Sequence, residues 1–368
     1  MEMKLKFTSL SLLLLIVGCE PMEDLVPRRD ANNALQCSNV KGLGVDYVKK
    51  VRERMSLAWS DEFNGPEDDK SPVSCFDQQP KCGIHDPYTP LRSCRISDPS
   101  KIRHLNKCNW IVQDGFNFMT SGKTSNPQGE AWDNAFSPDH VQVSNGVLRL
   151  TAEYTVSGSQ IKNPRKCGQN IWDQRDKTNV WSEDCPMLSG GIASAPMSEQ
   201  GFKGYKSRFG LYETRARWIT AKHGWPAIWM VQNEGWPKNG EIDIIEAWAE
   251  SGKSKVLMSV HSVRKEDLVK EGKLLDLNDD ETYSKSFFSP SYSSDEWHTY
   301  QVLWKEDKVQ FFIDGCHIDD INSRDAFHVP NTADMFLFIN LSMQNSKAIS
   351  AAGKSESWLE VDWIRHYK

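Results

Sequence analysis

The 368-residue sequence lacks the short motifs of several large enzyme classes. Gly-Lys-Thr at Gly122 and Gly-Lys-Ser at Gly252 and Gly353 are not preceded by the glycine that a P-loop needs five residues earlier, and neither H-E-x-x-H nor G-x-S-x-G occurs. No basic run with interleaved aromatic residues is present, and the net charge is −6. These absences argue against nucleotide binding, serine-hydrolase chemistry and a nucleic-acid partner.

The first nineteen residues have the pattern of a targeting segment. Lys4 and Lys6 precede an apolar stretch, Leu10 to Val17, that is too short to cross a bilayer as a stable helix. The string IVGC, which ends at Cys19, resembles a bacterial lipobox. We therefore expect residues 1–18 to be a lipoprotein signal peptide and Cys19 to be acylated, which would anchor the chain to the bacterial cell envelope, at the outer membrane or cell surface. Ordinary signal cleavage nearby is the alternative.

The cysteines form no C-x-x-C pair, so their spacing does not suggest structural zinc. Once Cys19 is set aside, an even number remains in a chain expected to be exported, which predicts an oxidised framework. Eight thiols allow about 105 connectivities, and the sequence does not choose among them. We expect only that those between Cys75 and Cys108 close a long loop locally. The eight are Cys37, Cys75, Cys82, Cys94, Cys108, Cys167, Cys185 and Cys316.

From Leu57 onward the sequence is mainly strand-like, with no regular helices between the strands, and it is 39% hydrophobic overall. This pattern favours an antiparallel β-sandwich over a parallel α/β sheet. The segments rich in β-branched or aromatic residues are Val147 to Tyr154, Gly210 to Trp218, Ala227 to Val231, Glu241 to Trp248, Val256 to His261, Trp297 to Trp304, Val309 to Asp314, Met335 to Met343 and Leu359 to Tyr367.

Three regions are expected along the chain. A tether and N-terminal extension follow the signal peptide over residues 19–54, with a short packed or helical segment near Tyr47 to Met55, and a single domain covers residues 55–368. Strand signals become sparse between about Gly65 and Gln128, which predicts an insertion at the rim of the sandwich. A second irregular stretch, Ser157 to Met187, is expected to overhang the same side.

The segment Gly240 to Glu246, GEIDIIE, places three carboxylates in an apolar, β-branched strand, where a buried acid is costly unless it is paired or used. Side chains alternate along a strand, so Glu241 and Asp243 share one face about 6.8 Å apart, whereas Glu246 is out of phase by one residue. A β-bulge would return Glu246 to the same face. The sequence therefore predicts a row of three acids on one wall of a cleft.

Paired carboxylates in an exported chain with 14 tryptophans indicate glycoside hydrolysis, because flat indole rings suit the apolar faces of sugars. Two glutamates on one strand face can approach to the roughly 5 Å that a retaining enzyme uses. A carboxylate between them would keep one glutamate ionised and the other protonated near neutral pH.

Several segments together resemble glycoside hydrolase family 16. GEIDIIE is similar to the E-x-D-x-x-E signature of that family in its bulged, laminarinase-like form. Five further segments occur in the expected order: WSDEFNG from Trp59, GLYETRARW from Gly210, GWPAIWM from Gly224, WHTYQVLWKEDKVQFFIDG from Trp297 and VDWIRHYK from Val361. The resemblance covers about residues 57 to 368. It implies an all-β jelly roll of two antiparallel sheets with a concave substrate cleft.

The resemblance also implies residue roles. It makes Glu241 the nucleophile, Asp243 the assisting acid and Glu246 the general acid/base. Trp236 matches a tryptophan that stacks on a sugar next to the scissile bond. Three more residues are candidates for the substrate-binding surface, although Trp225 could instead pack beneath the cleft and His261 could be a core histidine. These candidates are Trp225, His261 and Trp248; Trp229 is expected in the core.

Members of the family often carry a structural calcium ion on the convex face, and Asp362 occupies the position of one ligand. A plain surface aspartate is the alternative, because most of the other ligands would be backbone carbonyls that a sequence does not reveal. No metal or other cofactor is expected for the chemistry, and the protein is expected to be a monomer.

The favoured function is a retaining endo-β-glycosidase that cuts internal bonds of β-1,3-glucan or mixed-linkage glucan. Ala247-Trp248-Ala249 departs from the usual laminarinase continuation of the acid motif, and Asn340 to Gln344 lacks the Gly-Gly-Trp ending often found there. A β-galactan hydrolase, similar to an agarase or to enzymes that cleave host O-glycans or poly-N-acetyllactosamine, is therefore the alternative. A non-catalytic glycan-binding lipoprotein and a transglycosylase are further alternatives.

Overall fold

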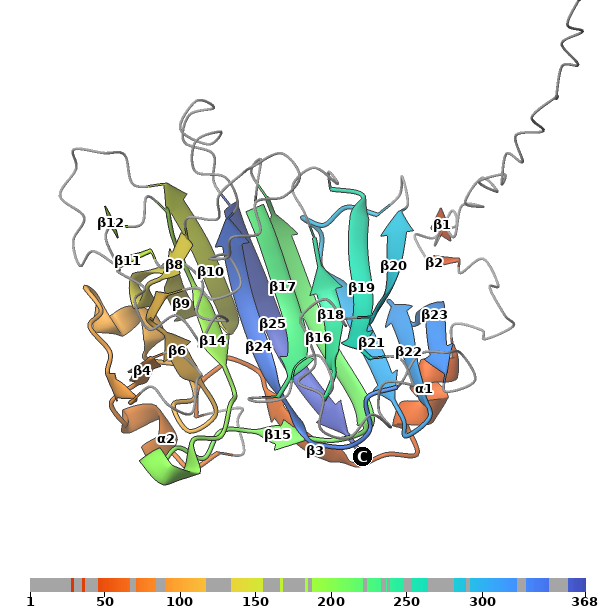
Figure 1. Ribbon diagram of the computed structural model, residues 1–368, viewed down its shortest axis with the longest axis horizontal. Coiled ribbons are helices and arrows are strands. Elements are labelled where there is room, and N and C mark those ends of the chain that lie inside the picture. The colour runs from red at the N-terminus through yellow and green to blue at the C-terminus, as the bar shows by residue number, and fades with distance from the viewer. Residues whose placement is uncertain are drawn as a thin grey trace, which may run out of the picture.

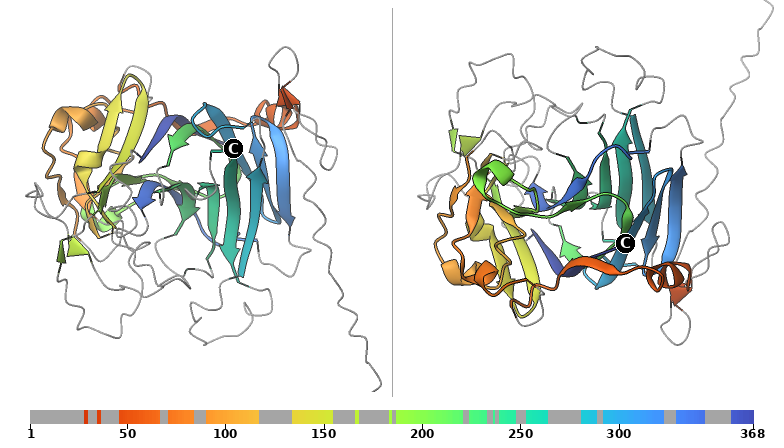
Figure 2. Two further views of the ribbon diagram at one scale, coloured as in Figure 1. Left: turned by 90° about the horizontal axis from the view of Figure 1, so that it is seen from above. Right: turned by 90° about the horizontal axis from the view of Figure 1, so that it is seen from below.

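A computed structural model of the chain shows a sandwich of two large β-sheets (Figures 1 and 2). This arrangement confirms the all-β class. The structure describes residues 28–29, 35–36, 46–66, 71–83, 90–116, 134–154, 166–167, 183–184, 187–220, 224–232, 236, 239–247, 253–263, 281–288, 292–322, 329–343 and 357–368.

One sheet has eleven of the described strands, in the order β23-β22-β21-β16-β25-β10-β13-β8-β7, with β3 paired to β25 and β9 to β10. Its strand pairs are antiparallel except β8 with β13, so the sheet is mixed. Its strands are β3 Leu57–Asp61, β7 Gly115–Phe116, β8 Asn134–Phe136, β9 Val141–Ser144, β10 Val147–Tyr154, β13 Met187–Ser189, β16 Gly210–Ile219, β21 His298–Trp304, β22 Lys308–Ile313, β23 Cys316–Asn322 and β25 Ser357–Tyr367.

The other sheet has ten of the described strands, in the order β20-β19-β18-β17-β24-β14-β6-β4-β5, with β15 paired to β24. Here β4 and β6 form the parallel pair. Its strands are β4 Lys81–Gly83, β5 Arg92–Ser93, β6 Ile111–Gln113, β14 Gly191–Ala193, β15 Lys206–Ser207, β17 Gly224–Val231, β18 Glu241–Glu246, β19 Lys255–Ser262, β20 Glu281–Phe288 and β24 Met335–Met343.

The largest apolar cluster among the described residues lies between the two sheets. It includes Ile242 and Ile339 from the ten-stranded sheet and Tyr300 and Leu359 from the eleven-stranded sheet, all of which are fully buried. Burial of such side chains contributes roughly 1.5–3 kcal/mol each, so this layer fixes the two sheets against each other. Residues that alternate with the core positions point to the outer faces, and the three acids of β18 belong to that set.

Helices are few among the described residues. The N-terminal segment expected near Tyr47 is the helix α1, Asp46–Arg52, and its residue Val48 packs on Phe312 of β22. No described helix has the length and apolar character needed to cross a membrane. The remaining short elements are α2 Ser74–Asp77, the 3-10 helices Pro99–Ile102, Pro138–His140 and Ser198–Gln200, and the strand pairs β1 Arg28–Arg29 with β2 Leu35–Gln36 and β11 Lys166–Cys167 with β12 Glu183–Asp184.

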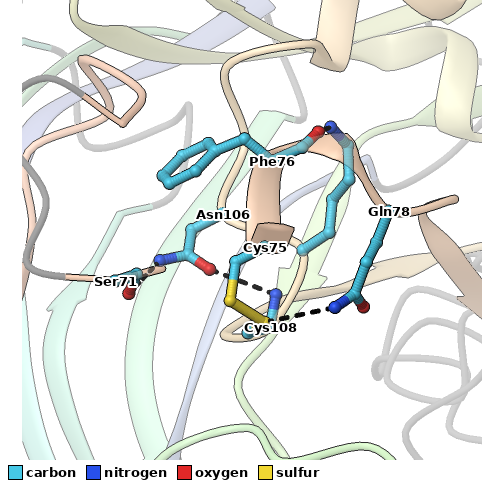
Figure 3. Close-up of a disulfide and its surroundings, with 7 residues drawn as sticks. Ser71, Cys75, Phe76, Gln78, Asn106 and Cys108 are labelled. Carbon is cyan, nitrogen blue, oxygen red and sulfur yellow. Dashed lines mark hydrogen bonds between the residues drawn. A yellow bond between two sulfur atoms is a disulfide. The ribbon is translucent and has the colours of Figure 1, made fainter. Parts of the chain in front are cut away.

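The expected rim insertion is partly incorrect, because β4, β5 and β6 extend the ten-stranded sheet. Two disulfides hold this region, Cys75–Cys108 and Cys82–Cys94, which confirms local closure between Cys75 and Cys108. Figure 3 shows the first of them, where the backbone N–H of Cys108 donates to Asn106 Oδ1 at 3.1 Å. Closing a loop of this length stabilises a fold by about 3–4 kcal/mol, which offsets the weak pairing of such short strands.

The face of the eleven-stranded sheet that points away from the core carries interleaved arginine, tryptophan and acid side chains. Glu360 of β25 accepts from Arg149 Nη1 of β10 at 2.6 Å and from Arg217 Nε of β16 at 2.8 Å. The two guanidinium groups also lie over aromatic rings, Arg149 at 4.9 Å from Trp358 and Arg217 at 4.6 Å from Trp297. Glu360 therefore links three adjacent strands.

Replacing this central acid is expected to destabilise the sheet. Glu360→Gln leaves two guanidinium groups without a neutralising carboxylate, and their partial exposure limits the cost to about 1–2 kcal/mol. Urea denaturation measures the change in the free energy of unfolding. Glu306→Gln, in the exposed β21–β22 turn, is the control and should change it by less than about 0.5 kcal/mol. Equal effects of the two variants would contradict the role given to Glu360.

Candidate active site

Strand β18 contains the predicted bulge. Asp243 pairs with Ser259 of β19, but the next paired residue is Glu246 with Leu257, so Ile244 and Ile245 face one residue of β19. Both isoleucines are fully buried in the core between the sheets. Two consecutive side chains on the core side return Glu246 to the face that carries Asp243. Strands β17, β18 and β19 lie side by side in Figure 1.

Each glutamate of the motif is held by the N–H of an indole ring. Trp236 Nε1 donates to Glu241 Oε2 at 2.9 Å, and Trp225 Nε1 of β17 donates to Glu246 Oε1 at 3.0 Å. Trp225 and Trp236 are both half-buried. The two rings therefore orient the carboxylates through their edges, a contact that leaves the expected stacking of Trp236 on a sugar as a prediction.

Strand β19 contributes two polar side chains to the acids. His261 lies directly opposite Glu241 in the strand register, and its Nε2 is 3.8 Å from Glu241 Oε1 and 3.4 Å from Asp243 Oδ2. Ser259 donates a hydrogen bond from its hydroxyl to Asp243 Oδ2. Among the described residues, no lysine or arginine forms an ion pair with any of the three acids. Within the part of the chain that the structure describes, His261 is thus the basic side chain that contacts this cluster.

Burial and the negative charge of Asp243 shift the two glutamates toward the protonated form. Burial raises the pKa of Glu246 to about 8, the negative charge of Asp243 adds to the shift, and the N–H of Trp225 opposes it. Burial also raises the pKa of Glu241 well above its usual range, with Asp243 adding, whereas His261 and the N–H of Trp236 lower it. The cluster therefore retains at least one proton near neutral pH.

The structure brings together most of the residues singled out from the sequence. Glu241, Asp243, Trp236 and His261 form one group of contacts, and Glu246 with its partner Trp225 lies on the same face of β18. Trp229 is buried, but in a second apolar cluster on the face of β17 opposite Asp243 rather than between the sheets, and its N–H donates to Asn340 Oδ1. Trp248, Cys19 and the signal peptide lie outside the described residues.

Sequence reasoning missed Ser259, which is fully buried and donates a hydrogen bond to Asp243. A signal for it was present, because Ser259 precedes His261 by two residues on an expected strand and so shares its face. A serine two positions from a candidate histidine is, however, a weak pattern without the register of the neighbouring strand.

Asp362 does not fit a calcium ligand in this arrangement. Its carboxylate Oδ2 accepts from Arg215 Nη1 of β16 in an ion pair, and the Arg215 guanidinium lies 4.8 Å from the Trp297 ring. A divalent cation at this oxygen would have to displace the guanidinium. The described residues contain one cluster of three potential metal ligands, Glu241, Asp243 and His261, on the other sheet.

The sequence pattern that defines "Glycosyl hydrolases family 16" matches residues 128–365, nearly two-thirds of the chain. The chain belongs to this family. The match includes all three acids and the bulged strand, and it agrees with the family suggested by the sequence motifs.

Individual relatives differ in their named substrates. An endo-1,3-1,4-beta-glycanase of Rhizobium meliloti is 24% identical over 70% of this chain and 46% of its own length. A keratan-sulfate endo-1,4-beta-galactosidase of Sphingobacterium multivorum is 24% identical over 40% of this chain and 31% of its own length. The alignments thus span less than half of each relative.

A solved structure of the laminarinase catalytic domain from Thermotoga maritima superposes with a TM-score of 0.52 at 19% identity, covering 85% of this chain and 98% of that one. At this level of identity the likeness concerns the fold alone, and it confirms the jelly-roll architecture.

The ion pair between Arg215 and Asp362 leads to a prediction about calcium. Millimolar Ca²⁺, compared with EDTA, is expected to change Tm by no more than about 1 °C, because the guanidinium already neutralises the carboxylate. By contrast, an ion that binds only the folded state, present at a concentration a hundred times its Kd, would raise the free energy of unfolding by about 2.7 kcal/mol. A rise of several degrees in a thermal melt would show that calcium binds despite Arg215.

Proposed function

We propose that the protein is a retaining endo-β-glycosidase. The observation that supports this most directly is the group of three acids, Glu241, Asp243 and Glu246, placed on one face of β18 by the bulge at Ile244. Buried carboxylates without a lysine or arginine partner are costly, and they persist in proteins where chemistry uses them. Membership of a glycosyl hydrolase family supports the same conclusion.

In the proposed mechanism, Glu241 is the nucleophile. Its carboxylate attacks the anomeric carbon and forms a glycosyl ester as the bond to the leaving oxygen breaks. The N–H of Trp236 holds Oε2 of this carboxylate, and His261 faces Oε1, so both favour the anion that attack requires. Hydrolysis of the ester by water then restores the starting configuration at the sugar.

Glu246 is the proposed general acid and base. With a pKa of about 8 it carries a proton at neutral pH and gives it to the leaving oxygen, then accepts a proton from the attacking water. Asp243 lies between the two glutamates along β18, and its charge adds to the rise in the pKa of Glu246. Asp243 thereby assists the acid without touching the sugar bond.

The proposed substrate is a β-1,3-glucan or a mixed-linkage glucan, cut at internal bonds. Support comes from the relative in Rhizobium meliloti, whose name describes an endo-1,3-1,4-beta-glycanase and whose alignment spans 70% of this chain. The alternative substrate is a β-galactan, which the relative named a keratan-sulfate endo-1,4-beta-galactosidase favours over a shorter alignment.

Export and lipid anchoring through Cys19 remain part of the proposal. They depend on the lysines, the apolar stretch and the lipobox-like string of the N-terminal residues. Mass spectrometry of the N-terminal peptide from the native host tests them: an acylated Cys19 as first residue supports the anchor, and an unmodified peptide contradicts it.

A substrate panel tests the enzyme and its specificity together. Purified protein is incubated with laminarin, lichenan, agarose, carrageenan and mucin glycans, and released reducing ends are measured. We expect release from laminarin or lichenan, with Glu241→Gln and Glu246→Gln reducing it by about 10³-fold or more, because each removes a group that reacts in the transition state. Binding without release by the wild type would contradict an enzyme. Release from agarose or mucin glycans alone would identify a galactan hydrolase, and longer products would identify transglycosylation.

The pH profile tests the role of Glu246. Because this residue must be protonated to act as the acid, kcat/KM is expected to fall as the pH rises through about 8. Trp225→Phe keeps an aromatic ring but removes the N–H that stabilises the Glu246 anion, so the alkaline limb should move to higher pH. Trp218→Phe, in β16 of the other sheet and buried in the core between the sheets, is the control and should leave the limb in place. A limb at the same pH in Trp225→Phe would contradict the assignment.

A further inference from the structure

A row of paired residues runs from Glu246 across the face of the ten-stranded sheet that carries the acids, and we call it the acid row. Glu246 of β18 pairs with Ala227 of β17. Ala227 pairs in turn with Asn340 of β24, and Asn340 pairs with Gly191 of β14 (Figure 1). Residues directly opposite each other on neighbouring strands point to the same face. The exposed fraction falls along the row, from 9% at Glu246 to 5% at Ala227 and 1% at Asn340.

The acid row has neutral borders. Trp225 and Trp229 stand on either side of Ala227, because alternate side chains of β17 share one face. Asn340 is fixed between the borders, since Trp229 Nε1 donates to its Oδ1 at 2.8 Å and its Nδ2 donates to Ser342 Oγ at 3.1 Å. None of these side chains carries a charge. The row therefore suits neutral sugar units, whose apolar faces pack on aromatic rings.

Phe136 closes the acid row at β14. A Cβ atom placed on Gly191 would lie 2.9 Å from Phe136 Cε1, so the phenyl ring rests directly on this glycine. The same ring packs on that of Phe338 of β24, with the ring centroids 6.0 Å apart. Phe136 belongs to β8 of the eleven-stranded sheet. A side chain of one sheet thus covers the end of a row that lies on the other.

We propose that Phe136 determines specificity by ending the stretch of the acid row in which neutral sugar units bind. The proposal rests on the function proposed above, because it concerns the substrate of that reaction. Three strand spacings separate β18 from β14, a span of about 14 Å. A glycan that crosses the sheet from Glu246 toward β14 therefore has room for only a short run of sugar units before it meets the phenyl ring.

The two sides of the acids consequently differ in what they hold. On the β14 side the glycan either ends at Phe136 or leaves the sheet there, so further units on this side add no contact and no affinity. On the β19 side the His261 side chain is 20% exposed, and the rest of the glycan extends that way. Binding affinity should therefore stop rising at a short length on the closed side.

Binding of oligosaccharides of increasing length tests the proposal without turnover. The probes come from the glycan that the wild type cleaves, or from laminarin and agarose if it cleaves none, and they are titrated by calorimetry into Glu241→Gln with and without Phe136→Ala. We expect the double variant to bind the longer probes about threefold or more tightly and the shortest ones unchanged, because loss of the ring uncovers Gly191. Phe312→Ala, which removes a similarly buried phenylalanine packed near α1, is the matched control and should not alter the length dependence.

A second variant secures the test if the alanine variant does not fold. Phe136→Leu retains an apolar side chain and is expected to shift the length dependence in the same direction by a smaller factor. An unchanged length dependence in either folded variant, or no binding of any probe, would overturn the proposal. A changed length dependence in a protein whose wild type cleaves no glycan would retain the closing role of Phe136 and refute the glycosidase function.

Discussion

The extra residue in β18 is the constraint on which the site depends. A strand exposes alternate side chains, and without the bulge Glu246 would point into the core between the sheets while Ile245 pointed outward. In the bulged strand Ile244 and Ile245 are both buried in the core, and Glu246 points outward instead. The burial of the two isoleucines stabilises this bulged register. The same apolar contacts that hold the two sheets together therefore place the three acids side by side.

The acids are then made compatible with burial by neutral donors. Indole N–H groups hold Glu241 and Glu246, a serine hydroxyl holds Asp243, and His261 faces two of the carboxylates. Neutral donors stabilise an anion less than an arginine does, so the pKa values of Glu241 and Glu246 stay high and a proton remains in the cluster. On the outer face of the eleven-stranded sheet, a buried acid is instead neutralised by ion pairs, because Glu360 pairs with Arg149 and Arg217 and links their strands. In the eleven-stranded sheet, Glu360 therefore stabilises the packing of neighbouring strands, whereas the acids of β18 in the ten-stranded sheet have no arginine partner among the described residues.

The sequence predicted the long central strands well, because β10, β16, β17, β19 and β24 carry clear β-branched and aromatic runs. The bulge was also predictable, because Glu246 is one residue out of phase with Glu241 and Asp243 in the alternation of strand side chains. The strands β4 and β5 were not, since they have two or three residues and depend on a disulfide and on the pairing of distant segments. The contacts of Trp225 and Ser259 were missed for a related reason: the direction of an indole N–H or a hydroxyl is set by neighbouring strands, which local sequence does not encode.

Covalent trapping is the most direct test of the arrangement in β18. The protein is treated with an activated 2-deoxy-2-fluoro glycoside of the sugar that it cleaves, which slows hydrolysis of the ester, and the labelled peptide is sequenced by mass spectrometry. If the bulged strand presents Glu241 as the nucleophile and Glu246 as the acid, one glycosyl unit is attached to Glu241. A label on Glu246, on Asp243 or on a residue outside β18, or turnover that proceeds without any covalent adduct, would contradict it.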